Sequence, residues 1–233
     1  MRKIDQRKIQ ILKLIVEEYI KTGAIMGSKN LLKKYDLRVS SATVRNDMMQ
    51  LESMGLIFQP YNSAGRLPTT RGIRVFVDYL MESLPSVLIE EESPKHPVIR
   101  SELIDDILYG MVARLSDTTK EIVFACIPSE GILCYLWLGN LLSSEDIWDR
   151  LEDARAIITI LEDKYSFIHM LENLSISPRA SVFIGNDALP PVIERCVIIS
   201  KSIEIKGKSG YIGILWTLQM DYAFNIATLR QIL

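Results

Sequence analysis

Apolar side chains recur at steps of three and four residues after Asp5, a residue type that commonly caps helices. The recurring residues are Ile9, Leu12, Ile15, Val16 and Tyr19. This spacing places them on one face of a helix. It predicts a first helix from Asp5 to Lys21, which Gly23 ends.

Two shorter helical patterns follow and are joined by a tight turn. The second helix begins at Ser28 and directs inward the side chains of Leu31, Leu32 and Tyr35. Either Ser40 or Ser41 caps the third helix, and Gly55 ends it. The apolar side of the third helix consists of Val44, Met48, Leu51 and Met54. This order is typical of helix-turn-helix units, which place their last helix in the major groove of DNA.

A short hairpin is predicted directly after the third helix. Residues 56–59 have the pattern of a strand, and residues 61–67 that of a loop between two strands, which is the position of a wing. Gly65 and Arg66 suit the tip of such a loop. Glycine lets a backbone come close to a phosphate or a minor groove, and arginine supplies the charge. The region therefore predicts a winged helix-turn-helix.

The polar side of the third helix carries residues that we expect to contact DNA. Its side chains are of the kinds that reach base edges and phosphates, namely Ser41, Thr43, Arg45, Asn46 and Gln50. Further candidates come from the second helix, the cap, the loop and the next helix, and they are Ser28, Lys29, Ser40, Tyr61, Ser63, Gly65, Arg66 and Arg71. The expected phosphate ligands are Lys29, Arg66 and Arg71. Because a helical face allows several registers, which of the other residues touch bases stays open.

The composition changes after a further helix, which Pro68 and Thr69 open. Its apolar side consists of Phe76, Val77, Leu80 and Met81. Residues 82–100 contain several prolines and a triplet of glutamates, so they are the predicted linker. The expected domains are therefore residues 1–81 and residues 101–233.

The pattern beyond the linker predicts helices around an antiparallel sheet. One helix begins at Ser101, residues 144–151 and the latter part of residues 157–174 predict two more, and a closing helix begins at Asp221. The predicted strands are residues 121–127, 132–138, 181–184, 196–205 and 211–215. The first two strands form a hairpin. This combination of helices and an antiparallel sheet predicts an α+β fold.

Charge is divided unevenly between the two parts of the chain. Residues 1–78 contain 14 Lys and Arg against 7 Asp and Glu, a net charge of +7. Subtracting these from the chain totals of 27 basic and 29 acidic residues leaves 13 and 22, a net charge of −9. A basic amino-terminal part on an acidic remainder favours a nucleic-acid-binding unit attached to a unit with another task. For any one run of lysines, a solvated helix face is the simpler interpretation.

Side chains for catalysis or metal binding are sparse. Residues 207–209 resemble the end of a phosphate-binding loop, but Ser202 stands where that motif needs glycine, so we expect a turn. His96 and His169 have no neighbours at metal-ligand or catalytic spacing. An odd number of cysteines in apolar surroundings predicts buried packing residues rather than disulfides, namely Cys126, Cys134 and Cys196. We therefore expect no enzyme, metal or cofactor.

The amino terminus carries no pattern of a targeting segment. It begins with charged residues and continues as an amphipathic helix, and no apolar run reaches the length of a membrane span. The sequence therefore predicts a cytoplasmic protein without a membrane partner.

Several long segments resemble the heat-inducible transcription repressor family, HrcA. In the amino-terminal part these are EEYIKTGAIMGSKNLL, VSSATVRNDMMQLESMGLI and QPYNSAGRLPTTRGIRVFVD. In the carboxy-terminal part they are SVFIGNDALPPVIERCVIIS and GYIGILWTLQMDY. Within the last segment the family's Gly-Pro-x-Arg-Met-Asp-Tyr run keeps only Met220, Asp221 and Tyr222. The resemblance is strong over residues 1–81 and weak over residues 101–233.

This resemblance implies a sequence-specific repressor of heat-shock or chaperone genes. It implies a winged helix-turn-helix domain, a GAF-like regulatory or dimerisation domain, and a homodimer that binds an inverted-repeat operator in double-stranded DNA. It also implies a chaperonin as a partner that maintains the active repressor. The chain resembles a short form that lacks the family's inserted dimerising domain, so the resemblance does not place the dimer interface. The alternative is a small-molecule-responsive transcriptional regulator that uses the GAF-like domain as a sensor.

Overall fold

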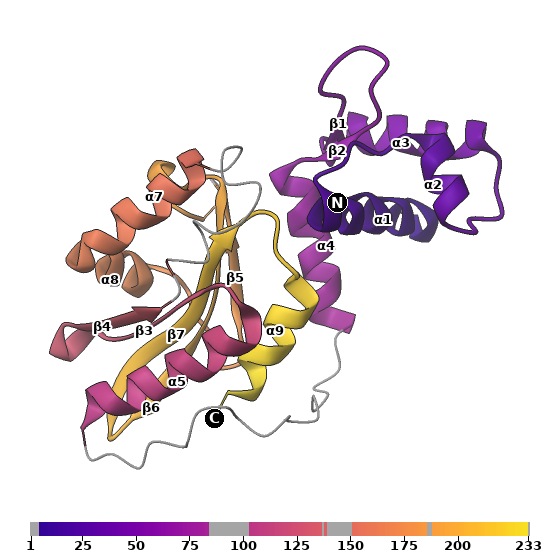
Figure 1. The fold of residues 1–233 in the computed structure, drawn as a ribbon. Coiled ribbons are helices and arrows are strands. Elements are labelled where there is room, and N and C mark those ends of the chain that lie inside the picture. The colour runs from indigo at the N-terminus through magenta and orange to yellow at the C-terminus, as the bar shows by residue number, and fades with distance from the viewer. Residues whose placement is uncertain (1–4, 84–102, 137, 139–150, 186–187, 233) are drawn as a thin grey trace. The chain divides into compact units, whose positions relative to one another are not determined.

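The chain divides into two compact units, Met1–Ser83 and Leu84–Leu233, in a computed structural model (Figure 1). The structure describes residues 5–83, 103–136, 138, 151–185 and 188–232. None of the helices in these ranges is long and apolar enough to cross a membrane.

Three helices open the first unit, and local capping sets their ends. α1 spans Gln6–Thr22, with Asp5 as its N-cap and Gly23, at a φ of 66°, as its C-cap. α2 spans Ser28–Lys34, and α3 spans Ser41–Ser53. The Ser40 hydroxyl accepts a hydrogen bond from the Thr43 backbone N–H, so Ser40, rather than Ser41, caps α3. The three predicted helices are therefore confirmed.

A two-stranded antiparallel sheet and a fourth helix complete this unit. β1 (Ile57–Phe58) pairs with β2 (Leu67–Pro68), and α4 spans Thr70–Ser83. The prediction that Pro68 opens a helix is wrong, because Pro68 pairs with Ile57 in the sheet. The cap is Thr69, whose hydroxyl accepts a hydrogen bond from the Gly72 backbone N–H. Since α4 extends to Ser83, the first two residues of the predicted linker are helical.

The apolar faces of these elements form one core. α1 packs against α3, α4 and β2, and α2 packs against α3. Nine of the thirteen predicted inward residues of α1, α3 and α4 are buried, including Leu12, Ile15, Val44, Leu51 and Val77. Burying each such side chain stabilises the fold by roughly 1.5–3 kcal/mol. The apolar face of α3 is therefore buried in the core, and its opposite face is exposed to solvent.

The second unit is built on a five-stranded antiparallel sheet in the order β4-β3-β7-β6-β5. The strands are β3 (Ile122–Ile127), β4 (Ile132–Leu136), β5 (Ser181–Ile184), β6 (Cys196–Ile205) and β7 (Lys208–Thr217). β6 and β7 form a long hairpin whose turn contains Lys206 and Gly207 at positive φ. Residues 207–209 thus belong to a turn and the start of a strand, which confirms the prediction of a turn instead of a phosphate-binding loop.

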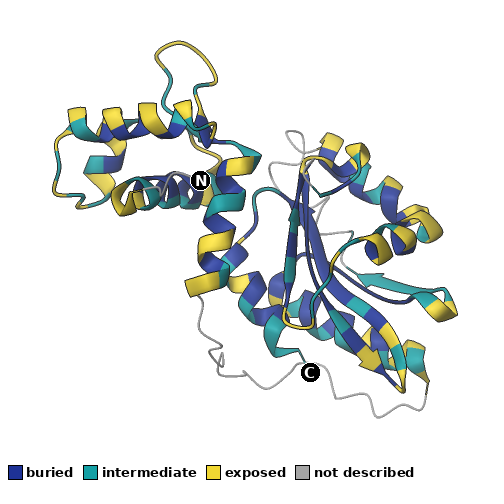
Figure 2. Ribbon diagram, turned by 180° about the vertical axis from the view of Figure 1, so that it is seen from behind, coloured by how far each residue is buried: buried dark blue, intermediate teal, exposed yellow. Residues whose placement is uncertain are grey.

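Helices lie on the sheet as Figure 1 shows: α5 (Ile104–Thr119), α7 (Leu151–Glu162), α8 (Lys164–Asn173) and α9 (Tyr222–Gln231). Short 3-10 turns occupy Pro128–Glu130 and Pro191–Ile193. α5 packs on β3 and β4, and α9 packs on β6. From another helix, the Phe167 ring of α8 meets the Phe124 ring of β3 edge-on, with centroids 5.0 Å apart. All six residues of β3 are buried, with α5 packed on the strand and Phe167 of α8 against Phe124. The long strands of the sheet are largely dark blue in Figure 2, that is, buried. The α+β fold is confirmed.

Most predicted elements of this unit agree with the structure. The helix after residue 101, the five strands and the closing helix capped by Asp221 are present. Residues 157–174 were expected to be helical only in their latter part, but α7 already begins at Leu151. The predicted helix at residues 144–151 and the linker lie almost wholly outside the described residues. Two of the three free cysteines are buried as predicted, whereas Cys134 is half-buried.

Candidate nucleic-acid interface

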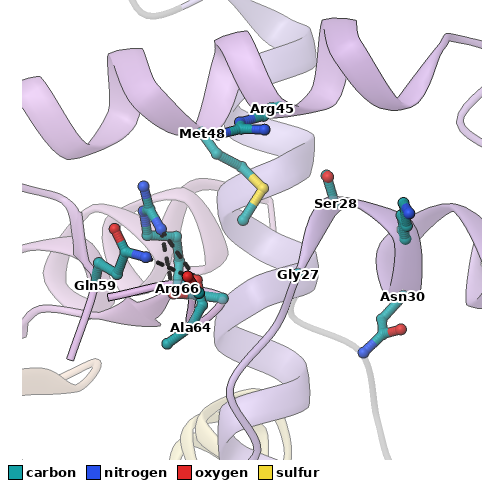
Figure 3. Close-up of a pocket in the computed structure, with 11 residues that line it drawn as sticks. Gly27, Ser28, Asn30, Arg45, Met48, Gln59, Ala64 and Arg66 are labelled. Carbon is teal, nitrogen blue, oxygen red and sulfur yellow. Dashed lines mark hydrogen bonds between the residues drawn. The ribbon is translucent and has the colours of Figure 1, made fainter. Parts of the chain in front are cut away.

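A groove of about 440 Å³ lies in the first unit among the start of α2, the outer face of α3 and the β1–β2 loop (Figure 3). The residues that line it are Gly27, Ser28, Lys29, Asn30, Arg45, Met48, Gln59, Ser63, Ala64, Gly65 and Arg66. Six of these were expected at a DNA interface, namely Ser28, Lys29, Arg45, Ser63, Gly65 and Arg66. Residues from three separate elements are therefore brought to one concave surface.

The outer face of α3 is polar and exposed. Arg45, Asn46 and Gln50 are exposed, whereas Val44 and Met48, which alternate with them along the helix, are buried. Among the described residues, neither Arg45 nor Lys29 of α2 forms an ion pair. Both cations are thus directed to the solvent, where an anion such as a phosphate can approach them.

Hydroxyl groups connect the starts of α2 and α3. The Ser28 and Ser41 hydroxyl oxygens lie 3.2 Å apart and share a hydrogen bond. The Ser40 and Thr43 hydroxyl oxygens lie 2.9 Å apart, besides the capping bond at the Thr43 N–H. The Ser28–Ser41 bond therefore joins the two helices, whereas Ser40 and Thr43 stabilise the start of α3.

Arg66 lies at the base of the β1–β2 loop, so its expected position at the tip is wrong. Its backbone forms an isolated antiparallel bridge with Met26, with N–O distances of 2.8 and 3.0 Å. Its guanidinium donates to a Glu52 carboxylate oxygen of α3, from Nη2 at 2.8 Å and from Nε at 3.1 Å. The side chain is only 15% exposed. Arg66 is therefore paired with an acidic residue of α3 and is not exposed at the tip of the loop.

The backbone at Gly65 comes close to the protein itself. A Cβ atom at this position would lie 2.4 Å from both the carbonyl carbon and the oxygen of Met26. The absence of a side chain at Gly65 is thus required by the bridge between residues 26 and 66, and close approach of Gly65 to a phosphate stays a prediction. The turn of the loop is made by Ser63, which has a φ of 67°.

The remaining predicted residues lie outside the groove. Tyr61 is 64% exposed in the loop. Arg71, in the first turn of α4, is exposed beside Gly55, which lies two residues after the end of α3. Asn46 and Gln50 share the outer face of α3 but do not line the groove. These four exposed residues lie on α3, in the β1–β2 loop and on α4, and they extend the polar surface beyond the groove.

Two buried acidic residues, which the apolar pattern does not predict, hold the helices of this unit together. Asp47 of α3 accepts hydrogen bonds from Arg7 of α1, at 2.7 Å from Nε and 3.2 Å from Nη2. Glu18 of α1 accepts from the Lys34 ammonium at 2.7 Å and from the Tyr35 hydroxyl at 3.0 Å. The contact with Lys34 lowers the pKa of Glu18. Carboxylates within the apolar stripes of α1 and α3 were the signal that could have revealed both pairs.

Within the described part of the second unit, no cluster of three or more His, Cys, Asp or Glu could hold a metal ion. His169 is exposed on α8 and contacts Asn173. Glu121 is buried and accepts a hydrogen bond of 2.8 Å from the Asn225 amide of α9, and burial raises its pKa to about 8. An open hollow of about 660 Å³ lies over α8 and the segment near Val192.

Together these features define a two-unit α+β protein with a small helical unit that exposes a cationic groove. The family model described as "HrcA protein C terminal domain" matches residues 76–226. The chain belongs to the HrcA family.

Two relatives share the name heat-inducible transcription repressor HrcA. The protein of Clostridium perfringens strain ATCC 13124 is 45% identical over 133 residues, which cover 54% of this chain and 38% of the relative. The protein of Acidothermus cellulolyticus is 39% identical over 126 residues, which cover 54% and 37%. The aligned regions thus span well under half the length of these relatives.

A solved structure, described as the crystal structure of a hypothetical protein at 2.2 Å resolution, has a similar fold. Its TM-score is 0.81 at 19% sequence identity, over 99% of this chain and 96% of that chain. This similarity concerns the fold.

Proposed function

We propose that this chain is a sequence-specific DNA-binding transcription repressor of heat-shock or chaperone genes. The observation that carries the proposal is the groove in which Lys29 and Arg45 are exposed without ion-pair partners among the described residues. The names of the two relatives, heat-inducible transcription repressors, support the same function.

The first unit, with residues 1–81 as the proposed domain, acts in this proposal as a winged helix-turn-helix. α3 is the recognition helix and presents Arg45, Asn46 and Gln50 to the major groove, because its opposite face is buried. The loop between β1 and β2 is the wing and lies along the neighbouring backbone. Lys29 and Arg71 are the proposed phosphate ligands, whereas Arg66 is engaged by Glu52.

Residues 101–233 are proposed to form a GAF-like regulatory and dimerisation domain. The five-stranded sheet with helices on both sides supports this assignment. Two protomers would place their α3 helices on the two halves of an inverted repeat, since a twofold-symmetric dimer matches a palindromic operator. A chaperonin is the proposed partner that maintains the repressor in the cytoplasm, so operator binding should increase after chaperonin treatment.

The proposal is tested by fluorescence-anisotropy titration of the purified chain. One duplex carries an inverted repeat from a chaperone-gene operator, the other its scrambled sequence, and each is titrated at two salt concentrations. Preference for the operator with two protomers per duplex is the expected result. Equal and strongly salt-dependent binding to both duplexes would reduce the function to non-specific DNA binding.

A small-molecule sensor is the alternative, and the open hollow in the second unit is the observation that favours it. Apolar and polar side chains share its lining, among them Met170, Tyr165, His169 and Asn173. Cys126 and Trp216, by contrast, belong to the buried core of the sheet. A thermal-shift screen that finds a metabolite stabilising the chain, with the effect lost in a Met170→Trp variant, would favour the sensor.

A further inference from the structure

We infer that Glu52 positions the β1–β2 loop for DNA binding by holding Arg66, and that Arg66 itself is a positioning residue rather than a phosphate ligand. This inference rests on the proposed DNA-binding function. It concerns how the loop is held beside α3, which neither the family nor the relatives' names specify.

The Arg66 guanidinium is occupied on all three of its nitrogen atoms. Nε and Nη2 donate to Glu52, at 3.1 and 2.8 Å, while Nη1 lies 3.4 Å from the Ala64 carbonyl oxygen and 3.3 Å from that of Gly65. With only 15% of the side chain exposed and two of its nitrogen atoms bound to Glu52, little of the guanidinium is left to meet a phosphate. The arginine therefore connects the end of the loop to α3.

Two further contacts fix the same end of the loop. The Met26–Arg66 backbone bridge joins it to the segment before α2, and this bridge leaves no room for a Cβ atom at Gly65. The Gln59 side-chain amide donates to the Ala64 carbonyl oxygen at 3.0 Å across the loop (Figure 3). The loop is thus fastened to α3 and to the start of α2, the two elements that carry Arg45 and Lys29.

Such fastening has a direct consequence for affinity. A loop that is already held in its bound position loses less conformational freedom when DNA binds, so less of the interaction free energy is spent on ordering it. Glu52 carries a negative charge close to the proposed DNA surface, where simple electrostatics would make it unfavourable. Its pairing with Arg66 accounts for an acidic residue at this position.

The test compares Glu52→Gln, Arg66→Ala and the double variant in the full-length chain. If Glu52 positions the loop, Glu52→Gln should weaken operator binding by about tenfold. This is the change expected when one charge-assisted hydrogen-bonded pair, partly screened by solvent, is lost. The positioning role also predicts that the double variant binds no worse than Arg66→Ala alone, because both changes break one contact. Glu17→Gln on α1 is the control, since it removes a negative charge from the same unit without touching the loop.

The opposite outcome is equally clear. If Arg66 were a phosphate ligand, Glu52→Gln would free it and strengthen DNA binding, and Arg66→Ala would lower the slope of log K against log salt by about one. Tighter binding of Glu52→Gln than of Glu17→Gln, or additive losses in the double variant, would overturn the inference.

A second readout needs no DNA. Hydrogen exchange of the Met26 and Arg66 backbone amides, which form the bridge, should be at least about fivefold faster in Glu52→Gln than in the wild-type chain, since local opening governs such exchange. Unchanged exchange would contradict the positioning role. A wild-type chain that binds no duplex would instead refute the proposed function and leave this readout standing.

Discussion

At the scale of single residues, Gly65 lies against the Met26 backbone and Arg66 is bound by Glu52, all within the first unit. The sequence predicts a particular task for this pair in the loop, but not these partners. A glycine indicates that something approaches the backbone closely, but not which group does so. An arginine can form two parallel hydrogen bonds with a carboxylate or with a phosphate. Arg45, by contrast, is exposed on the face predicted for it.

Arg45→Ala should weaken operator binding by about 1–3 kcal/mol and reduce discrimination against the scrambled duplex, if Arg45 makes a bidentate base contact. Lys29→Ala should weaken binding to all duplexes alike and lower the salt slope by about one. Anisotropy titrations at several salt concentrations measure both effects. Arg155→Ala, at an exposed position of α7, serves as the control. Wild-type operator binding by Arg45→Ala would show that α3 is not the recognition helix.

At the scale of elements, local signals located helices and strands well. Asp5 and Gly23 bracket α1, Asp221 caps α9, and the bounds of β5 and β6 agree with the predicted strands. These signals depend on a few neighbouring residues, so they can be recognised from the sequence alone. The pairs that connect elements, such as Arg7 with Asp47, depend on packing and were not predicted.

Arg7→Ala should lower the free energy of unfolding of the first unit, because it leaves the buried Asp47 carboxylate without the hydrogen bonds that Arg7 donates. Asp36→Asn breaks an ion pair between exposed side chains and should change it by no more than about 0.5 kcal/mol. Urea unfolding followed by circular dichroism measures both. A loss for Arg7→Ala as small as that for Asp36→Asn would mean that Asp47 gains little from the contact.

At the scale of the whole molecule, the strand order is the feature that spacing did not supply. β3 lies beside β7, although the two strands are separated in sequence by most of the unit. Glu121, directly before β3, is buried and accepts a hydrogen bond from Asn225 of α9. The titration of Glu121 is therefore a consequence of the tertiary fold and bears on the stability of the whole second unit.

The second unit should lose stability as the pH rises from about 4.5 to about 8, owing to Glu121. Burial raises the pKa of Glu121 in the folded chain from 4.5 to about 8, so over this range the folded state keeps a proton that the unfolded state releases. The effect is complete above pH 8 and amounts to the order of 3–5 kcal/mol. Glu121→Gln should flatten the dependence, which urea unfolding at pH 5.5, 7 and 8.5 would measure. Glu204→Gln, at an exposed position of β6, should keep the wild-type slope; a steep slope in Glu121→Gln would assign the effect to other groups.

The sequence alone determined most helices and strands, the caps Asp5 and Asp221, and the exposed polar face of α3, because periodicity and capping depend on residues within a few positions of one another. The tertiary structure decided which side chains meet. Glu52 and Arg66 are separated by 14 positions, Arg7 and Asp47 by 40, and Glu121 and Asn225 by 104. Contacts over such separations follow from how elements pack. Packing therefore made Arg66 a partner of Glu52 and left Arg45 and Lys29 exposed in the groove.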